Sequence, residues 1–367
     1  MNIAIMGAGL SGLACAITLE KHGITPSIFE KRSKIGDRFV NGEILLNIFT
    51  RPVHDGIASL SEKHGIFLHP TSSIQSLTLF SQHERAVIEG QLGFTNVRGR
   101  EEDSYEFQLS RQVKAPISFN SDKTYEQLLK DFTHVVMATG DGEYAKQTRN
   151  FREDLSVSMK GATVEGSFDR YTVMAWMDYE IAPYGYGYVI PYSEKKPILS
   201  SLFPTAPSPR IYLSKISGCD FIKKLWQHST KISMLPMSFR FQTILLRICR
   251  SARLANTFYT GNCFGSMMPF MGFGQYVALL TGIYAAYDLC GLGRYEELTK
   301  PLRQSYENSL VLRRAMEQLD NNDLDWVVSW LQSYIGEKLF QSKAINPLRI
   351  ASYMLRPYIK LKQGVTT

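Results

Sequence analysis

The chain has 367 residues, of which 44% are hydrophobic and 20% charged, and its formal net charge is +7. This composition excludes a disordered chain, and the length favours two or three domains around a large core. Five cysteines without a CxxC pair argue against a zinc ribbon or a disulfide framework, so we expect reduced thiols and no metal site.

The first thirty residues follow the pattern of a strand, a glycine turn, a helix and a second strand that ends in Glu30. Gly7 permits a tight turn, Gly9 lets the backbone approach a pyrophosphate, and Gly12 lets the helix pack on the strand. The helix N-terminus offers N–H groups to phosphates, and Glu30 can accept hydrogen bonds from a ribose 2′-hydroxyl. A strand-to-helix turn without a ligand is the alternative. We predict a bound dinucleotide with these contacts: Gly7, Ala8, Gly9, Leu10, Ser11, Gly12 and Glu30.

Two later segments have the pattern of further strands of the same sheet. Residues 115–119 follow a helix-like run with Glu106 in its first turn, and the apolar run 134–137 is typical of a buried parallel strand. The second run ends on Ala138-Thr139-Gly140, where glycine lets the backbone pass close to a ligand at the carboxyl edge of the sheet. A purely structural turn explains this glycine almost as well.

From about residue 143 to 256 the sequence alternates and is rich in aromatic residues, for example in 172–177, 184–192 and 198–203. Such period-two segments predict an antiparallel sheet with one buried face.

A glycine-rich loop at 261–275 then precedes an apolar helical stretch at 276–288. This predicts a second helix N-terminus, which favours a phosphate or an anionic reduced flavin. The remaining residues are predicted to be helical, with an acidic break at 320–323.

Basic residues gather in two segments of the chain. The segment from Arg210 to Arg253 contains nine Lys or Arg residues and one acidic residue. The sequence after Glu337 contains six Lys or Arg residues and no acidic residue. Because apolar residues are interleaved with these charges, we predict contact with anionic lipid headgroups, and a core-facing helix with a solvated face is an equal alternative. No nucleic-acid-reading motif accompanies the charge, so nucleic acid is not expected as a partner.

The predicted location follows from what the sequence lacks. A predicted strand that starts at residue 2 leaves no room for a signal peptide, and no uninterrupted apolar run is long enough to span a bilayer. We therefore expect a cytoplasmic protein, attached peripherally to a membrane through its basic segments.

The two glycine loops, with a strand ending on Ala-Thr-Gly between them, resemble FAD-dependent oxidoreductases of the p-hydroxybenzoate hydroxylase type. Within that group the sequence is most similar to the geranylgeranyl reductase family. The family's late motif, GDAxGxxxPxxGxGIxxA, is matched by Gly261, Gly265, Pro269, Gly272, Gly274 and Ala278. Residues 184–191 are similar to the family's YxWxFP segment, which lines the substrate cavity. Arg100, ahead of an SxxFxxxL-like helix, adds to a likeness that covers most of residues 1–290.

This resemblance implies an α/β fold in three parts. A Rossmann-like FAD-binding domain of the GR2 type comprises residues 1–142 and 257–292. An inserted antiparallel-sheet substrate domain comprises residues 143–256, and a helical C-terminal region with a basic tail comprises residues 293–367.

The resemblance also implies FAD as the cofactor and an apolar small molecule as the substrate. For Lys31 and Arg38 the alternative to a cofactor contact is a solvated charge on the protein surface. No catalytic residue has a motif of its own. The implied cofactor contacts beyond the first turn are Lys31, Arg38, Arg100, Ala138, Thr139, Gly140, Asn262, Pro269, Gly272 and Gly274. The implied residues of the substrate cavity are Tyr184, Tyr186, Tyr188 and Pro191.

Two departures from the family pattern bear on function. Asn262 replaces the usual aspartate, which is expected to bind the ribityl hydroxyls; asparagine still accepts a hydrogen bond but carries no charge. Tyr188 and Ile190 replace the Trp and Phe of YxWxFP, which keeps an apolar lining but leaves the substrate open.

The resemblance favours reduction of a carbon–carbon double bond in an isoprenoid-like substrate. A flavin-dependent monooxygenase or halogenase is the alternative, and a non-catalytic flavin protein for electron transfer or interaction is the second alternative. Because the sequence has no second GxGxxG, NADPH would bind transiently or another reductant would replace it.

Overall fold

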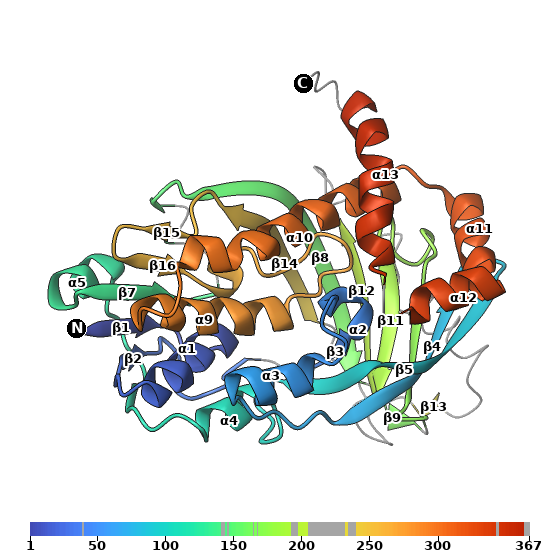
Figure 1. The fold of residues 1–367 in the computed structure, drawn as a ribbon. Helices are drawn as coiled ribbons and strands as arrows, with labels where there is room; N and C mark the ends of the chain where they lie inside the picture. The colour runs from blue at the N-terminus through green and yellow to red at the C-terminus, as the bar shows by residue number, and fades with distance from the viewer. Residues whose placement is uncertain are drawn as a thin grey trace.

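The computed structural model describes residues 1–38, 40–140, 144, 147–163, 165–166, 168–191, 197–204, 232–233, 240–342 and 345–362. Within these residues the strands form a six-stranded sheet, an eight-stranded sheet and a two-stranded ribbon. Figure 1 shows the smaller of the two main sheets beside the N-terminus and the larger one at the opposite end of the molecule. Residues 210–231 and 234–239 of the first basic segment lie outside the described residues.

The six-stranded sheet is built from short, apolar and mostly parallel strands. Ile3, Ile5, Val135 and Val136 on its central strands are almost fully buried, as expected of parallel strands covered on both faces. Only the pair at one edge, β15 with β16, is antiparallel. In spatial order the strands are β15 (Arg253–Leu254), β16 (Thr257–Tyr259), β7 (His134–Met137), β1 (Ile3–Met6), β2 (Ser27–Phe29) and β6 (Ile117–Ser118).

Two apolar helices, α1 (Leu10–Lys21) and α9 (Gln275–Leu289), pack together against this sheet (Figure 1). A Cβ atom on Gly282 would lie 2.0 Å from the carbonyl oxygen of Ser11, so glycine is what allows the two helices to approach so closely. Three shorter helices lie before β7: α3 (Gly56–His64), α4 (Tyr105–Ser110) and α5 (Tyr125–Asp131). Two short helical segments are α2 (Asn47–Thr50), which follows β3, and η1 (Gly261–Cys263), which follows β16.

The eight-stranded sheet is antiparallel except where β4 and β10 run parallel. The strands from residues 143–256 pair with one another in antiparallel fashion, as predicted, and the parallel pair joins one of them, β10, to β4 from outside that range. In spatial order its strands are β14 (Arg240–Cys249), β8 (Phe151–Thr163), β12 (Pro197–Pro204), β11 (Tyr186–Pro191), β10 (Thr172–Trp176), β4 (Ser72–Phe80), β5 (Arg85–Arg98) and β3 (Asn41–Leu46). The two-stranded ribbon pairs β9 (Glu165–Gly166) with β13 (Ile232–Ser233).

Strand pairing differs from the predicted division of the chain. β3, β4 and β5 fall within residues 1–142, assigned above to the FAD-binding domain, yet they form one side of the eight-stranded sheet. The physical reason is a shared core: Ile74, Leu77 and Ile88 of the β4–β5 hairpin pack in one buried cluster with Val173 of β10. Conversely, β15 lies in the six-stranded sheet, although residues 253–254 were assigned to the inserted domain.

The C-terminal region is helical, as the sequence predicts. Its acidic break forms a capping box at the start of α11, in which the Asp320 carboxylate accepts from the backbone N–H of Asp323 and the Asp323 carboxylate accepts from the backbone N–H of Asp320. Across the part of the chain that is described, no helix combines the length and the apolar character needed to cross a membrane. The helices are α10 (Tyr295–Met316), α11 (Asn321–Gln332), α12 (Tyr334–Gln341) and α13 (Pro347–Lys362).

Candidate functional site

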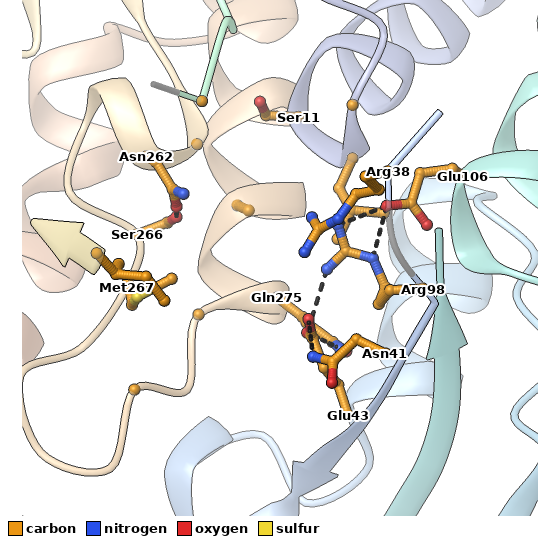
Figure 2. Close-up of a pocket in the computed structure, with 18 of the residues that line it drawn as sticks. Ser11, Arg38, Asn41, Glu43, Arg98, Glu106, Asn262, Ser266, Met267 and Gln275 are labelled. Carbon is orange, nitrogen blue, oxygen red and sulfur yellow. Dashed lines mark hydrogen bonds and ion pairs between the residues drawn. The ribbon is translucent and has the colours of Figure 1, made fainter. Parts of the chain in front are cut away.

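A cavity of about 1330 Å³ extends from the β1–α1 turn to the face of the eight-stranded sheet. One end is lined by the glycine turn and charged side chains, and the other by apolar side chains of β4, β8, β10 and β11. The loop between η1 and α9 lies along the cavity and contributes Ser266 and residues 271–274 to its lining, while Asn262 of η1 and Gln275 of α9 line it on either side of this loop. Figure 2 shows this loop opposite a cluster of charged residues.

The glycine turn combines two kinds of glycine. Gly7 has φ +111°, and a Cβ there would lie 2.4 Å from the carbonyl oxygen of Ala138; a Cβ on Gly12 would lie 2.0 Å from the carbonyl oxygen of Gly7. Gly9 is different, because a Cβ there would meet no protein atom within 4 Å. Gly7 and Gly12 are therefore required by the fold, whereas the bare backbone of Gly9 leaves space for a ligand.

The N-terminus of α1 faces this space. Its N-cap residue is Gly9, no side chain caps the helix, and Leu10 and Ser11 of the first turn line the cavity. The N–H groups of a first helical turn have no partner within the helix, so an anion in the cavity can accept from them.

Glu30 closes this end of the cavity. Its carboxylate accepts from the backbone N–H of Ala8 at 2.8 Å and from that of Arg32 at 2.9 Å. These two bonds hold the carboxylate at the carboxyl end of β2, where the fingerprint predicts a ribose contact. Lys31 also lines the cavity, with an exposed side chain.

Four charged residues group beside the turn (Figure 2): Arg38, Glu43, Arg98 and Glu106. Arg98 lies at the centre and donates from Nε to Glu106 Oε1 at 2.9 Å and from an Nη atom to Glu43 Oε2 at 3.2 Å. Glu106 also accepts from the backbone N–H of Gly99 at 3.3 Å. We call these four residues the charged cluster.

Burial and pairing compete in the charged cluster. Burial lowers the pKa of Arg98, but Glu106 and Glu43 outweigh it and raise that pKa above its ordinary value. Burial raises the pKa of Glu106, but Arg98 outweighs it and lowers that pKa. For Arg38, burial and the neighbouring Arg98 win and lower the pKa, against the opposing effect of Glu43 and Glu106. An anion in the cavity would therefore favour the charged form of Arg38.

Amides extend the charged cluster toward α9. Gln275, the first residue of α9, exchanges two hydrogen bonds of 3.0 Å with Asn96 of β5 and donates from Nε2 to Glu43. Asn41 donates to Glu43 Oε1 at 3.3 Å. The charged cluster thus joins β3 and β5 of the large sheet to the N-terminus of α9.

The loop between η1 and α9 supplies a second helix N-terminus to the cavity. The N-cap of α9 is Gly274, again without a side-chain cap, and a Cβ there would lie 2.8 Å from the carbonyl oxygen of Ser266. The exposed Asn262 side chain accepts from Ser266 Oγ at 2.8 Å through Oδ1. Its carbonyl oxygen therefore already has one donor, and an amide oxygen has capacity for a second.

The far end of the cavity is apolar. Tyr186 and Tyr188 lie in this wall, but their hydroxyls are engaged: Tyr186 donates to the carbonyl oxygen of Met271, and Tyr188 contacts Met159 Sδ at 3.8 Å. Burial raises the pKa of Tyr186, with a smaller contribution from Tyr188. Further lining residues of this wall are Leu77, Leu79, Val157, Val173, Ala175 and Ile190.

Most of the predicted site residues meet in this cavity, but five do not line it. Gly12 lies behind the turn, and Pro269 is buried within its loop. Arg100 is exposed, with its Nε atom 3.6 Å from Asp37 Oδ1. Tyr184 is 45% exposed outside the cavity, and its carbonyl oxygen accepts from Arg313 at 2.7 Å. Pro191 ends β11 opposite Pro197.

The reason for the displaced tyrosine is the course of its segment. Tyr184 precedes β11 and has φ +52°, so it lies in a turn and not on the strand that forms the cavity wall. The predicted lining residues that the structure does place in the cavity are Gly7, Ala8, Gly9, Leu10, Ser11, Glu30, Lys31, Arg38, Ala138, Thr139, Gly140, Tyr186, Tyr188, Asn262, Gly272 and Gly274.

Sequence reasoning missed most of the charged cluster. Glu43 and Arg98 have no predicted role, Gln275 lies within the late glycine motif but has no predicted role there, and Glu106 is predicted only as an acid in a first helical turn. The register of β3 against β5, which sets Asn41 opposite Arg98 and Glu43 opposite Asn96, brings Glu43 near Arg98. Glu106 contacts Arg98 from α4, and Gln275 contacts Glu43 from α9. Among the described residues, no three His, Cys, Asp or Glu side chains are placed to hold a metal ion.

Comparison with known proteins agrees with this architecture. A family model described as an NAD(P)-binding Rossmann-like domain matches residues 5–55. A geranylgeranyl bacteriochlorophyll reductase-like protein from Thermoplasma acidophilum has a similar structure, with a TM-score of 0.75, 14% identity and 98% of each chain covered. The likeness establishes the fold. The predicted α/β architecture with a Rossmann-like domain is confirmed.

Two halogenating enzymes also have similar structures. A triple mutant of a flavin-dependent brominase matches with a TM-score of 0.67 and 13% identity over 99% of this chain and all (100%) of its own. A flavin-dependent halogenase matches with a TM-score of 0.65 and 14% identity over 96% of this chain and 77% of its own. A comparison with curated protein sequences finds no match.

FAD fits the residues of this cavity. Two uncapped helix N-termini, of α1 and α9, face one space, and a Cβ on Gly9 or Gly140 would have no protein atom within 4 Å beyond the neighbouring residues. The first helix end, Glu30 and Arg38 suit an adenosine diphosphate. Asn262 and the N-terminus of α9 suit the polar atoms of the ribityl chain and the flavin ring.

Proposed function

We propose that the protein is an FAD-dependent oxidoreductase that reduces a carbon–carbon double bond in an apolar, isoprenoid-like substrate. The observation that supports this most directly is one continuous cavity that joins the glycine turn of β1–α1 to an apolar sheet face. Bound FAD would supply the hydride chemistry, and the chain would bind and orient both reactants.

The polar end of the cavity would hold the cofactor. The N–H groups at the start of α1 and the guanidinium of Arg38 would face the pyrophosphate, while Glu30 would accept from the adenosine ribose. Glu43 and Glu106 would favour the charged form of Arg38, against the effects of burial and of Arg98, and the pyrophosphate would add to their effect. The other end of the cofactor would lie beside Asn262 and the N-terminus of α9.

The apolar wall would hold the substrate. Leu77, Leu79, Val173 and Ile190 present hydrocarbon to the cavity, so an alkyl chain would leave water on binding. Tyr188 is half-buried in the same wall, and its hydroxyl contacts Met159 Sδ.

The electron donor would be NADPH, bound transiently, or another reductant. The sequence carries one dinucleotide fingerprint, and the cavity at that fingerprint is the one that suits FAD. A resident second dinucleotide is therefore not part of the proposal.

An anaerobic reoxidation experiment tests the proposed reaction. The purified protein is reconstituted with FAD, reduced under argon and mixed with a geranylgeranyl compound while the flavin absorbance is followed. We expect the oxidised flavin spectrum to return together with a product two hydrogen atoms heavier. The saturated analogue of the compound is the matched control, and it should leave the flavin reduced.

The same preparation separates the alternatives. Rapid oxygen consumption that depends on an aromatic substrate, or on a halide, would replace the reductase with a monooxygenase or a halogenase, which the brominase and halogenase likenesses allow. A bound flavin that responds to neither substrate nor oxygen would indicate an electron carrier or an interaction protein. A protein that takes up no FAD would overturn all of these assignments.

A further inference from the structure

The last helix, α13, exposes an apolar stripe. Ile350, Tyr353, Met354, Tyr358 and Leu361 are 48%, 45%, 76%, 48% and 82% exposed. Their spacing of three or four residues places them along one side of the helix. A helix on the surface of a globular protein normally turns polar residues to water, so this stripe indicates contact with something else. We call these five residues the α13 stripe.

The other side of α13 is already in contact with the protein. Ser352 and Ile359 are buried, and α13 packs beside α10 (Figure 1). Arg356 of α13 donates to Asn308 Oδ1 of α10 at 2.8 Å. The stripe is therefore a second apolar side on a helix that is already anchored, and Figure 1 shows α13 projecting from the molecule toward the C-terminus.

Positive charge borders the α13 stripe. The guanidinium carbons of Arg349 and Arg356 lie 5.7 and 5.2 Å from the ring centroid of Tyr353. The sequence after Glu337 contains six Lys or Arg residues and no Asp or Glu. The stripe thus combines aliphatic and tyrosine side chains with cations, the composition of helices that lie in the headgroup region of a bilayer.

We propose that the α13 stripe docks the protein on an anionic lipid surface, with α13 lying along the membrane. Tyr353 and Tyr358 would sit at headgroup level, Met354 and Leu361 would reach the acyl chains, and Arg349 would face lipid phosphates. This inference does not depend on the proposed redox reaction.

A second copy of the chain is a poorer occupant. In a symmetric contact between two α13 helices, Arg349 and Arg356 of both copies would approach one another with no acid in this segment to offset them. The apolar surface of α11 is also a poorer fit to anionic lipid. Its exposed Trp326 shares the helix with Asp323 and Asp325.

Vesicle co-sedimentation of the full chain tests the proposal. We expect binding to phosphatidylcholine vesicles that contain phosphatidylglycerol, weaker binding to phosphatidylcholine alone, and loss of binding at high salt. The double variant Ile350→Ser/Met354→Ser should lower the partition coefficient about tenfold or more, since two side chains lose their transfer from water. Leu361→Ser, at the most exposed position, is a second variant in case the first unfolds.

Phe67→Ser is the matched control. Phe67 is 58% exposed and also has a cation over its ring, with Lys21 Nζ 5.9 Å from the centroid, but it lies far along the chain from α13. Its loss should leave vesicle binding unchanged. Binding that survives the α13 substitutions, or no binding to anionic vesicles, would overturn the proposal. So would sedimentation velocity that shows a dimer which the α13 double variant dissociates, because a second copy would then cover the stripe.

Discussion

The two ends of the cavity are built on different physical principles. At the dinucleotide end, backbone N–H groups and paired charges set the position of each group, and Arg98 and Glu106 are almost fully buried there. At the other end, aliphatic side chains of the large sheet form a wall whose apolar contacts impose no direction on a bound group. Polar interactions are directional, and a buried polar group without a partner costs free energy. The free energy gained from apolar contact depends on the area buried and not on direction.

The contrast teaches where this protein should tolerate change. Removing one partner at the dinucleotide end leaves a buried charge or blocks a backbone contact, so single substitutions there should have large effects. At the apolar end, volume decides what binds, so a substitution should change the choice of substrate and leave the cofactor in place. Three substitutions test this contrast.

The largest effect is expected for Arg98→Met. Glu106 is 3% exposed and would lose its main partner, and breaking a buried pair in this way costs about 3–5 kcal/mol. We expect the free energy of unfolding, measured by urea denaturation, to fall by that amount.

The double variant Arg98→Met/Glu106→Gln is the control, because it removes the uncompensated charge. It should regain a large part of the lost stability. If Arg98→Met alone is as stable as the wild type, Arg38 must pair with Glu106 in its place. The arrangement of the charged cluster would then be less specific than its geometry indicates.

Gly9→Ala should have the next largest effect, on cofactor affinity alone. A Cβ at this position meets no protein atom within 4 Å, so the unfolding free energy without FAD should stay within error of the wild type. The methyl group would occupy the space of a pyrophosphate, so we expect FAD affinity to fall by about tenfold to a hundredfold in a fluorescence titration.

Gly12→Ala provides the matched comparison. Its Cβ would lie 2.0 Å from the carbonyl oxygen of Gly7, so this variant should lose stability even without FAD. Equal FAD affinity in wild type and Gly9→Ala would mean that no cofactor lies against Gly9.

The smallest effect is expected at the apolar end. Ala175 lines the cavity from β10, and Ala175→Phe would fill part of the apolar space in which the proposed substrate would bind. We expect the KM for an isoprenoid alkene to rise about tenfold, with FAD affinity unchanged. Ala175→Val, which adds less volume, should have a KM between those of the wild type and Ala175→Phe. Loss of FAD from Ala175→Phe would show that the two ends of the cavity are not independent.

Several local elements were predictable from the sequence. The β1–α1–β2 unit and β7 appear where their apolar runs and glycines place them, and Asp320 starts α11 as a cap. These features follow from interactions within a few residues: strand and helix periodicity, a glycine with positive φ, and side-chain capping. The same local logic fails at Tyr184, the first residue of its motif, which lies in a turn outside the cavity.

By itself, then, the sequence determined the glycine turn, the carboxylate that follows β2 and the glycine loop ahead of α9. Only the tertiary structure decided that β3, β4 and β5 join the large sheet, and that Glu43, Arg98 and Glu106 meet at its edge. The reason is that strand register and the burial of shared apolar faces act between residues far apart in the chain, where no local spacing records them.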